Sequence, residues 1–411
     1  MPKKDRYIVG LDIGTSKICI LVAELKEDGT IDITGVSRVD AKGLRKGVII
    51  NVDPTVECIK KAVEEAELMS SINIEQAYVG IAGEHIMGSN SRGMISINSK
   101  DHIISRDDIS RVIEAAKTIP IPTDKDILHV LPQEFIVDGQ GEINDPLGMS
   151  GSRLEVNVHV VTCGTTQLQT LLTCVNRAGL EVVDTVLQPL ASSEAVLTPD
   201  EKELGVALID IGHGTTDLAI FEKQSLWHSY IRSIGGEHFT NDIAVGLRTP
   251  TSEAERIKKR HGCALSSLIQ DDETIEVPSV GGRKSRYMSR QVLSEIIQPR
   301  AEELFGIMRE EIDRMGFSHA LNSGIVLTGG GSLLEGMVEV AERIFDLPVR
   351  IGRPTGVGGL IDVIHSPEYS TAVGLIIYGY RTRDVRSMGG ARVMPRRKSF
   401  WRIRDWIGAM F

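Results

Sequence analysis

Several features that define common protein classes are absent from this 411-residue sequence. No apolar run reaches the roughly 18 residues that a membrane-spanning helix needs, and the N-terminus leads into a strand-like segment without a signal-peptide core. With 41% apolar and 25% charged residues, the chain also lacks the composition of a disordered protein. We therefore expect a cytosolic protein of two to four globular domains, at roughly 100 to 200 residues per domain.

Cysteine and nucleotide signatures of the common kinds are missing as well. The five cysteines form no CxxC pair and no Cys/His cluster, which disfavours a zinc site or a disulfide framework and is typical of small buried side chains in a reducing compartment. No glycine loop continues into the GK[ST] of a Walker A motif, and the GxGxxG spacing of a dinucleotide fold is absent.

Charge is distributed unevenly along the chain. Residues 381–411 hold nine Lys or Arg against two acids, a net charge of +7, and the total of −10 therefore leaves −17 on residues 1–380. An acidic body is a poor general binder of nucleic acid, whereas a short basic tail suits an anionic surface.

One sequence pattern occurs twice, 198 residues apart. An apolar run ends at Asp12 and is followed by Gly14-Thr-Ser-Lys17 and a second apolar run; the same order returns at Asp210 and Gly212-His-Gly-Thr-Thr216. Each copy predicts a buried strand, a tight turn and a second strand. The repeat indicates two halves built on one plan.

These two turns have the chemistry of a phosphate and metal site. Glycine lets the backbone approach a ligand, and successive turn N–H groups form an anion-binding nest. Hydroxyl groups and one cation add further donors, and an aspartate at each strand end suits Mg²⁺, which prefers oxygen ligands and keeps several waters. Asp12 and Asp210 are the predicted metal residues, and the predicted phosphate contacts are Gly14, Thr15, Ser16, Lys17, Gly212, His213, Gly214, Thr215 and Thr216. Lys17 and His213 either contact the phosphates or point to solvent.

A third glycine loop follows another β-branched run. Gly329, Gly330, Gly331 and Ser332 come before an expected helix from about Leu333 to Phe345. Such a loop lets a nucleoside lie against the backbone, with a helix N-terminus facing its phosphates.

Five segments together resemble the nucleotide-site motifs of the actin, sugar-kinase and DnaK superfamily, and within it the bacterial FtsA family of cell-division proteins. They are the two Asp-Ile-Gly hairpins, the Gly329–Ser332 loop, Asp184-Thr-Val-Leu-Gln188-Pro-Leu-Ala and Tyr369-Ser-Thr-Ala-Val-Gly-Leu. The resemblance extends over the whole chain and includes Val277-Pro-Ser-Val-Gly-Gly-Arg283. It implies an α/β protein with the actin-like ATPase fold, two duplicated halves around a central nucleotide cleft, each with an inserted small subdomain.

The resemblance also implies domain boundaries. The first core subdomain is 1–83 with 163–203, and the second is 204–234 with 304–380. Residues 84–162, with a helix capped by Ser105 and Asp108, form an insertion that the family uses for self-association and division-partner contacts. Residues 235–303 form a small subdomain, 381–397 a flexible linker and 398–411 an amphipathic helix.

Further site residues are implied by the resemblance. Glu255, Lys258 and Lys259, on an expected helix, are placed beside the nucleoside, although they also fit a solvated helix face. Gln188 occupies the segment that positions a hydrolytic water in actin-like ATPases, or it simply satisfies a helix start. ATP with Mg²⁺ is the expected cofactor, with slow ATPase activity at most.

A cluster of cations suggests a protein partner. Arg283, Lys284, Arg286, Arg290 and Arg300 stand against one acid between residues 281 and 300. They could receive an acidic peptide, and the resemblance implies the C-terminal peptide of the tubulin-like FtsZ. A solvated face is the alternative.

The C-terminal residues predict a helix that lies on a membrane. At about 100° per residue, one apolar arc forms, flanked by arginines that can reach lipid headgroups. The predicted membrane residues are Phe400, Trp401, Arg402, Ile403, Arg404, Trp406, Ile407, Met410 and Phe411. Docking of this helix on the protein's own body is the alternative.

The resemblance implies an ATP-binding protein that polymerises, tethers FtsZ filaments to the inner face of the cytoplasmic membrane at the division site and recruits later divisome proteins for septum formation. A PilM-like pilus-assembly scaffold is the nearest rival. A carbohydrate kinase would need an aspartate base, for which no residue stands out. A DnaK-like chaperone would need a further substrate-binding domain.

Overall fold

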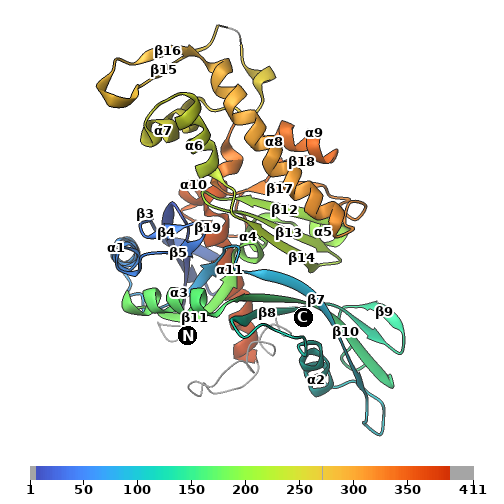
Figure 1. The fold of residues 1–411 in the computed structure, drawn as a ribbon. Coiled ribbons are helices and arrows are strands. Elements are labelled where there is room, and N and C mark those ends of the chain that lie inside the picture. Colours follow the sequence, from blue (N-terminus) through green and yellow to red (C-terminus); the bar gives the residue numbers. More distant parts are fainter. Residues whose placement is uncertain (1–5, 271, 389–411) are drawn as a thin grey trace.

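The computed structural model describes residues 6–270 and 272–388 (Figure 1). Two α/β halves lie one above the other, and a third, smaller sheet lies beside the lower half (Figure 1). The predicted membrane residues from Phe400 to Phe411 lie outside the described residues. Within the described part of the chain, no helix is both long and apolar enough to cross a membrane.

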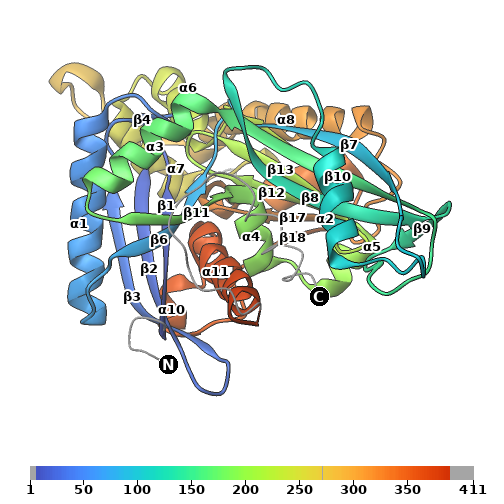
Figure 2. The same ribbon diagram turned by 90° about the horizontal axis from the view of Figure 1, so that it is seen from below.

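The first half is a six-stranded sheet whose order is β11-β6-β1-β2-β3-β19. Its strands are β1 (Tyr7–Ile13), β2 (Lys17–Leu25), β3 (Ile31–Asp40), β6 (Gln76–Ile81), β11 (Glu181–Leu187) and β19 (Gly358–Gly359). Helices α1 (Val52–Ser70) and α3 (Thr165–Arg177) cover one face, and α11 (Ser370–Met388) covers the other (Figure 2). Since both faces are covered, β2 is a continuous run of buried apolar residues and does not alternate.

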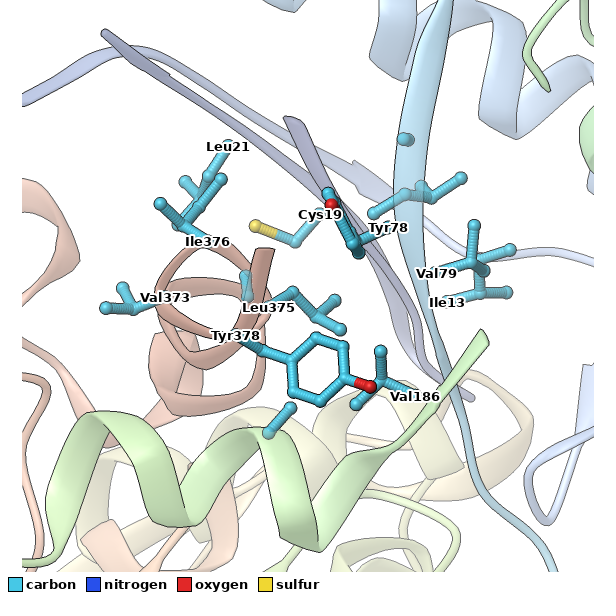
Figure 3. Packing of buried hydrophobic residues seen from close by; sticks show 14 of the residues in the cluster. Ile13, Cys19, Leu21, Tyr78, Val79, Val186, Val373, Leu375, Ile376 and Tyr378 are labelled. Atoms are coloured by element: carbon cyan, nitrogen blue, oxygen red, sulfur yellow. The ribbon is translucent and has the colours of Figure 1, made fainter. Parts of the chain in front are cut away.

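Close packing holds α11 against this sheet. Figure 3 shows Leu375, Ile376 and Tyr378 of α11 lying against side chains from the strands, and the rings of Tyr78 and Tyr378 meet edge to face with centroids 6.2 Å apart. Gly374 of α11 lets α4 (Gln188–Val196) approach, because a Cβ there would lie 1.8 Å from the carbonyl oxygen of Ala191. The C-terminal helix is therefore part of the core.

The second half repeats this plan. Its sheet has the order β14-β13-β12-β17-β18, with strands β12 (Val206–Ile211), β13 (Thr216–Glu222), β14 (Ser225–Arg232), β17 (Ile325–Thr328) and β18 (Val349–Ile351). In both halves the first strand pairs antiparallel with the second and parallel with a later strand. Asp12 pairs with Cys19, and Asp210 pairs with Asp217, so the two hairpins that the repeat predicted have the same register.

Four helices pack with this sheet in the second half. They are α6 (Gly236–Gly246), α7 (Thr251–His261), α8 (Arg290–Arg314) and α9 (Met337–Phe345). Two short helices, α5 (Pro199–Leu204) and α10 (Ile361–Ile364), do not belong to this group. Short 3-10 turns lie at Ser266–Leu268, Val280–Gly282, Gly330–Leu333 and Pro367–Tyr369. A two-stranded ribbon, β15 (Thr274–Val277) and β16 (Arg286–Ser289), projects beside α7 (Figure 1). The helices share one apolar core with β12 and β17, and the boundary expected at residue 303 falls inside α8.

The insertion has a core of its own. Strands β7 (Met87–Ser96), β8 (Lys125–Val137), β9 (Gln140–Ile143) and β10 (Arg153–Gly164) form a sheet in the order β7-β10-β8-β9, and α2 (Arg106–Ala116) packs on it. Ser105 and Asp108 form the predicted capping box of α2. A small hairpin, β4 (Leu44–Arg45) with β5 (Val48–Ile49), lies near the central cleft of the first half.

Two predicted boundaries are wrong. The helix after the third glycine loop begins at Met337 and not near Leu333, because Gly330–Leu333 forms a 3-10 turn and Gly336 adopts φ 83° before the helix. Helix α11 does not end at Tyr380 but continues to Met388, so the first residues assigned to a flexible linker are helical. There Thr382 is buried and its hydroxyl donates to the Tyr378 carbonyl at 2.9 Å.

Candidate functional site

The two glycine turns face each other across one cleft. The Gly14 N–H donates to the Lys17 carbonyl at 2.9 Å, and the Gly212 N–H donates to the Thr215 carbonyl at the same distance, so the turns are built alike. A Cβ at Gly214 would lie 2.6 Å from Thr15 Oγ1. The halves therefore meet at these turns, and the cleft between them has a cavity volume of about 690 Å³.

The structure brings most of the predicted cofactor residues to this cleft. The lining includes Asp12, Gly14, Thr15, Ser16, Lys17, Gln188, Asp210, Gly212, His213, Gly214, Thr215, Glu255, Lys258, Lys259, Gly329, Gly330 and Gly331. Residues of both repeats and of the third loop thus contribute to one site.

Two predicted residues point elsewhere. The hydroxyl of Thr216 is turned away and donates to the Ile234 carbonyl at 2.7 Å. Ser332 donates to the carbonyl of Gly329 at 2.7 Å and is buried. Neither lines the cleft, so both stabilise the turns that do.

Asp12 is buried at the end of β1. Gln188, the first residue of α4, donates from Nε2 to Asp12 Oδ1 at 2.9 Å. Burial raises the pKa of Asp12 to about 6, although nearby Lys17 partly offsets the effect. The structure therefore gives Gln188 a definite contact at the site, while its role in positioning water stays a prediction.

Asp210 and Asp217 form the acidic wall of the second half. Asp210 accepts hydrogen bonds from Ser192 at 2.6 Å and Thr371 at 3.4 Å, and burial raises its pKa. Asp217 is 3% exposed, and its Oδ1 has no hydrogen-bond partner among the described residues. Burial, and then repulsion from Asp210 and Asp12, raises the pKa of Asp217 well above its usual value.

These three carboxyl groups fit a hydrated cation. Their mutual repulsion and the orphaned oxygen of Asp217 would be relieved by positive charge in the cleft. Among the described residues, no three His, Cys, Asp or Glu side chains are grouped closely enough to hold a metal by themselves. Mg²⁺ would therefore be held by Asp12 and Asp210, with water and phosphate oxygens completing its shell.

Lys17 and His213 both line the cleft, and their contact with phosphates stays a prediction. Lys17 Nζ hydrogen-bonds the Glu368 carbonyl and lies 4.9 Å from the centre of the Tyr369 ring. Burial lowers the pKa of His213, with a smaller contribution from Lys258. His213 is therefore a neutral donor or acceptor at neutral pH.

Helix α7 places a charged pair inside the cleft. Lys258 Nζ lies 2.7 Å from Glu255 and donates to the Gly236 carbonyl and to Thr240. The pKa of Glu255 falls to about 2, because Lys258, Thr240 and Lys259 outweigh the opposing effect of its burial. Lys259 pairs with Glu255 at 3.1 Å but is 68% exposed. A purely solvated face does not describe Glu255 and Lys258.

The third glycine loop supports the second aspartate. Gly329 has φ 78°, and a Cβ there would lie 2.3 Å from Asp210 Oδ1. At Gly331 a Cβ would lie 2.3 Å from Ile211 Cγ2. Glycine is therefore required for the loop to pack against the end of β12.

The five cations predicted to bind a partner do not form one free patch. Arg300 is paired with Asp242 at 2.7 Å and with Glu303. Arg286 donates to the Leu247 carbonyl. Of the five, only Arg283 and Lys284, at the tip of the ribbon, are exposed.

Arg290 belongs to the cleft instead. Its guanidinium pairs with Glu273 at 2.8 Å and with Glu335, and donates to the His261 carbonyl at 2.8 Å. Arg290 also lines the cavity beside α7. The acids lie outside the window 281–300, which is why the local charge count missed them.

Sequence reasoning also missed Asp217, Ser192 and Thr371. Asp217 directly follows the second glycine turn and pairs with Asp210 across the hairpin, but its equivalent in the first copy is Cys19, so the repeat did not mark an acid there. Thr371 lies within a quoted motif and Ser192 directly follows another, but only the fold shows that they converge on Asp210.

Family comparisons agree with this architecture. A family model described as cell division protein FtsA matches residues 207–374, and one described as the SHS2 domain inserted in FtsA matches residues 83–162. A model for the type IV pilus assembly protein PilM matches residues 146–266.

Solved structures share the fold at low identity. The PilM–PilN type IV pilus biogenesis complex has a TM-score of 0.67 at 16% identity, covering 91% of this chain and 98% of that one. An MreB protein of Spiroplasma citri bound to ADP has a TM-score of 0.57 at 15% identity, covering 94% of this chain and 100% of that one. These likenesses establish the actin-like ATPase fold.

Curated relatives are much more similar in sequence. The cell division protein FtsA of Pseudomonas aeruginosa is 47% identical over 412 residues, covering 99% of this chain and 98% of the relative. The FtsA proteins of Escherichia coli K12 and Bacillus subtilis are 42% and 40% identical and cover 91% and 94% of this chain, and 90% and 86% of their own lengths. At this identity over most of both chains, the chain belongs to the FtsA family of bacterial cell-division proteins.

Proposed function

We propose that this cell-division protein binds Mg²⁺ and ATP in its central cleft, polymerises, tethers FtsZ filaments to the cytoplasmic membrane and recruits later divisome proteins through the insertion. The observation that carries the nucleotide claim is the pair of matching glycine turns, Gly14–Lys17 and Gly212–Thr215, on opposite walls of one cavity. Two such turns supply backbone donors from both sides to a chain of phosphates. The ADP-bound MreB neighbour supports the assignment of a nucleotide.

Nucleotide would connect the two halves directly. A ligand that touches both turns stabilises the closed arrangement more than an open one, so it shifts the population toward the closed form. A rigid closed protomer presents complementary surfaces at its two ends and can assemble head to tail. Any hydrolysis, with Gln188 orienting water, would then regulate assembly.

For the FtsZ contact, exposed cations at the ribbon tip are the residues to test. An Arg283→Glu/Lys284→Glu variant is expected to weaken binding of the acidic C-terminal peptide of FtsZ at least tenfold, about 1.4 kcal/mol, because attraction becomes repulsion. Fluorescence anisotropy with a labelled peptide measures this. Arg300 is a poor test, because its reversal would break the pair with Asp242.

The control for this variant is Arg343→Glu, an exposed cation on α9 outside the ribbon. It changes total charge without touching the ribbon, and the peptide affinity should stay within about twofold. If both variants weaken peptide binding equally, only net charge matters. If the ribbon variant binds the peptide with unchanged affinity, the ribbon tip is not the FtsZ contact.

The membrane claim rests on residues 398–411, whose sequence predicts an amphipathic basic helix. The full chain should pellet with vesicles of anionic lipid in the presence of Mg²⁺ and ATP, while a chain ending at Arg397 should remain in the supernatant. Binding should weaken as salt is raised, because basic residues near the surface each add on the order of 1 kcal/mol. Equal pelleting of both chains would contradict the role of the tail.

A further inference from the structure

A second cavity lies at the far ends of α4 and α11 from the nucleotide cleft. Its volume is about 340 Å³, and it is bounded by β8 of the insertion, α4 and α11 of the first half, and α5, β13 and β14. Gln188 of α4 and Thr371 of α11 line the nucleotide cleft, whereas Glu194 and Tyr378 on the same helices line this second cavity. We call it the basal cavity.

The walls of the basal cavity combine a cluster of apolar side chains with polar and charged ones. Three rings, from Phe135, Phe221 and Tyr378, and four aliphatic side chains line it; the latter are Leu131, Leu190, Leu197 and Leu226. Such walls suit aromatic guests. Its volume is of the order needed for one or two aromatic side chains.

The charged groups of the basal cavity leave no free cation on its wall. Lys202 Nζ pairs with Glu194 at 2.8 Å and lies 5.1 Å from the centre of the Phe221 ring, and Arg381 pairs with the same carboxylate. Exposed acids stand on the elements around it, among them Asp145 and Asp200. Lys202 and Arg381 share one carboxylate, so the wall itself carries a net charge of +1, and only the acids of the rim attract a basic guest. A guest whose aromatic side chains enter the cavity and whose basic residues stay at the rim therefore suits this site.

The chain itself supplies such a segment. Residues 389–411 carry six Lys or Arg against one acid, with Phe400, Trp401, Trp406 and Phe411. They follow directly after α11, whose Arg381 and Thr382 line the basal cavity. From Thr382 to the end of α11 at Met388, seven helical residues extend about 10 Å. The next eleven residues can span up to roughly 35 Å, and Gly389-Gly390 lets the chain reverse direction.

We propose that the basal cavity is a docking site for the chain's own C-terminal segment, residues 398–411. The segment places one or two of its aromatic side chains in the cavity and its basic residues against the acids of the rim. This inference rests on the proposed membrane role of the same residues, because one apolar face cannot be buried in lipid and in the cavity at once. Docking therefore competes with membrane binding and lowers the apparent vesicle affinity by the fraction of undocked chains.

Tryptophan fluorescence tests this in the full-length chain. The chain has three tryptophans, and a Trp227→Phe background leaves only Trp401 and Trp406 as reporters. Without lipid, their emission should be blue-shifted and less quenched by acrylamide than that of a synthetic peptide of residues 389–411. Identical emission and quenching in protein and peptide would overturn the proposal. A shift that depends on protein concentration would also overturn it, because the tail would then occupy another copy.

A matched pair of variants locates the docking site. Asn144 is exposed on the rim of the basal cavity, and Asn144→Arg adds bulk and repels a basic guest. It should move the emission to that of the free peptide and raise vesicle affinity roughly threefold or more. Asn176→Arg, the same change at an exposed position on α3, should do neither. Equal effects of the two variants would contradict the proposal.

The two proposals fail in different ways. If the parent chain binds vesicles but its tryptophan emission equals that of the free peptide, the docking proposal is wrong and the membrane anchor is supported. If the emission is blue-shifted and Asn144→Arg returns it to that of the free peptide, but no variant binds vesicles, the docking is supported and the membrane anchor is wrong.

Discussion

An Asp12→Asn variant is expected to be more stable than the parent chain without nucleotide, and yet to bind Mg²⁺ and ATP at least tenfold more weakly. Burial raises the pKa of Asp12 from 3.8 to about 6, so a charged carboxylate at neutral pH costs the empty fold on the order of 3 kcal/mol. Asparagine retains the oxygen that accepts from Gln188 but carries no charge. Gain of stability with loss of binding is typical of a residue kept for function.

The pH dependence of unfolding gives the sign of this effect. Because the folded pKa of Asp12 lies above the unfolded value, the folded chain holds more protons between about pH 4 and 6. The contribution of Asp12 to stability is therefore fully present below about pH 4 and is lost as pH rises through 6. Chemical denaturation of both chains across this range should give a difference that is small at pH 4 and largest above pH 6. A constant difference would contradict the assignment.

A Gly214→Val variant is expected to bind Mg²⁺ and ATP at least a hundredfold more weakly. A Cβ at Gly214 would lie 2.6 Å from Thr15 Oγ1 and 3.1 Å from Lys46 Cα, so a branched side chain holds the two turns apart. The phosphates can then contact only one turn at a time and lose the hydrogen-bond donors of the other. A hundredfold loss of affinity corresponds to about 2.7 kcal/mol of binding free energy. Calorimetric titration with nucleotide measures the change.

The matched control for this steric effect is Gly306→Val on α8. A Cβ at Gly306 meets no heavy atom within 4 Å, so the substitution should leave nucleotide affinity unchanged. The opening is expected to stay local to the two turns, because the apolar cluster of the first half continues into Val206, Leu208 and Phe221 of the second and holds the halves together. The thermal stability of the empty Gly214→Val chain should therefore stay close to that of the parent. A large fall in its melting temperature would show a folding defect and not a closure defect.

Local patterns in the sequence predicted the repeated hairpins well. Their apolar runs are long, the glycines mark the turns, and the constant offset of 198 residues places Asp12 and Asp210 in equivalent positions. The capping box of Ser105 and Asp108 also lies at the start of α2 as the sequence predicted, because a cap depends only on residues three positions apart. Short-range signals were sufficient in these segments.

What the sequence could not predict depends on distant partners. Arg290 and Arg300 looked like free cations, because Glu335 and Asp242, which pair with them, lie far along the chain. Helix α11 continues beyond its predicted end at Tyr380, because Arg381 pairs with Glu194 and Arg383 donates a hydrogen bond to the Tyr7 carbonyl. Tertiary contacts override weak local propensity in such segments.

Hydrogen exchange of the two turns, with and without Mg²⁺ and ATP, tests the central claim most directly. If one nucleotide is held by both halves, backbone amides of Gly14–Lys17 and Gly212–Thr215 should both exchange more slowly when it binds, because both turns line the cleft. Protection should disappear from both turns in Gly214→Val and persist in Gly306→Val. Protection confined to one turn, or absent from both at saturating nucleotide, would contradict a cleft that closes around ATP.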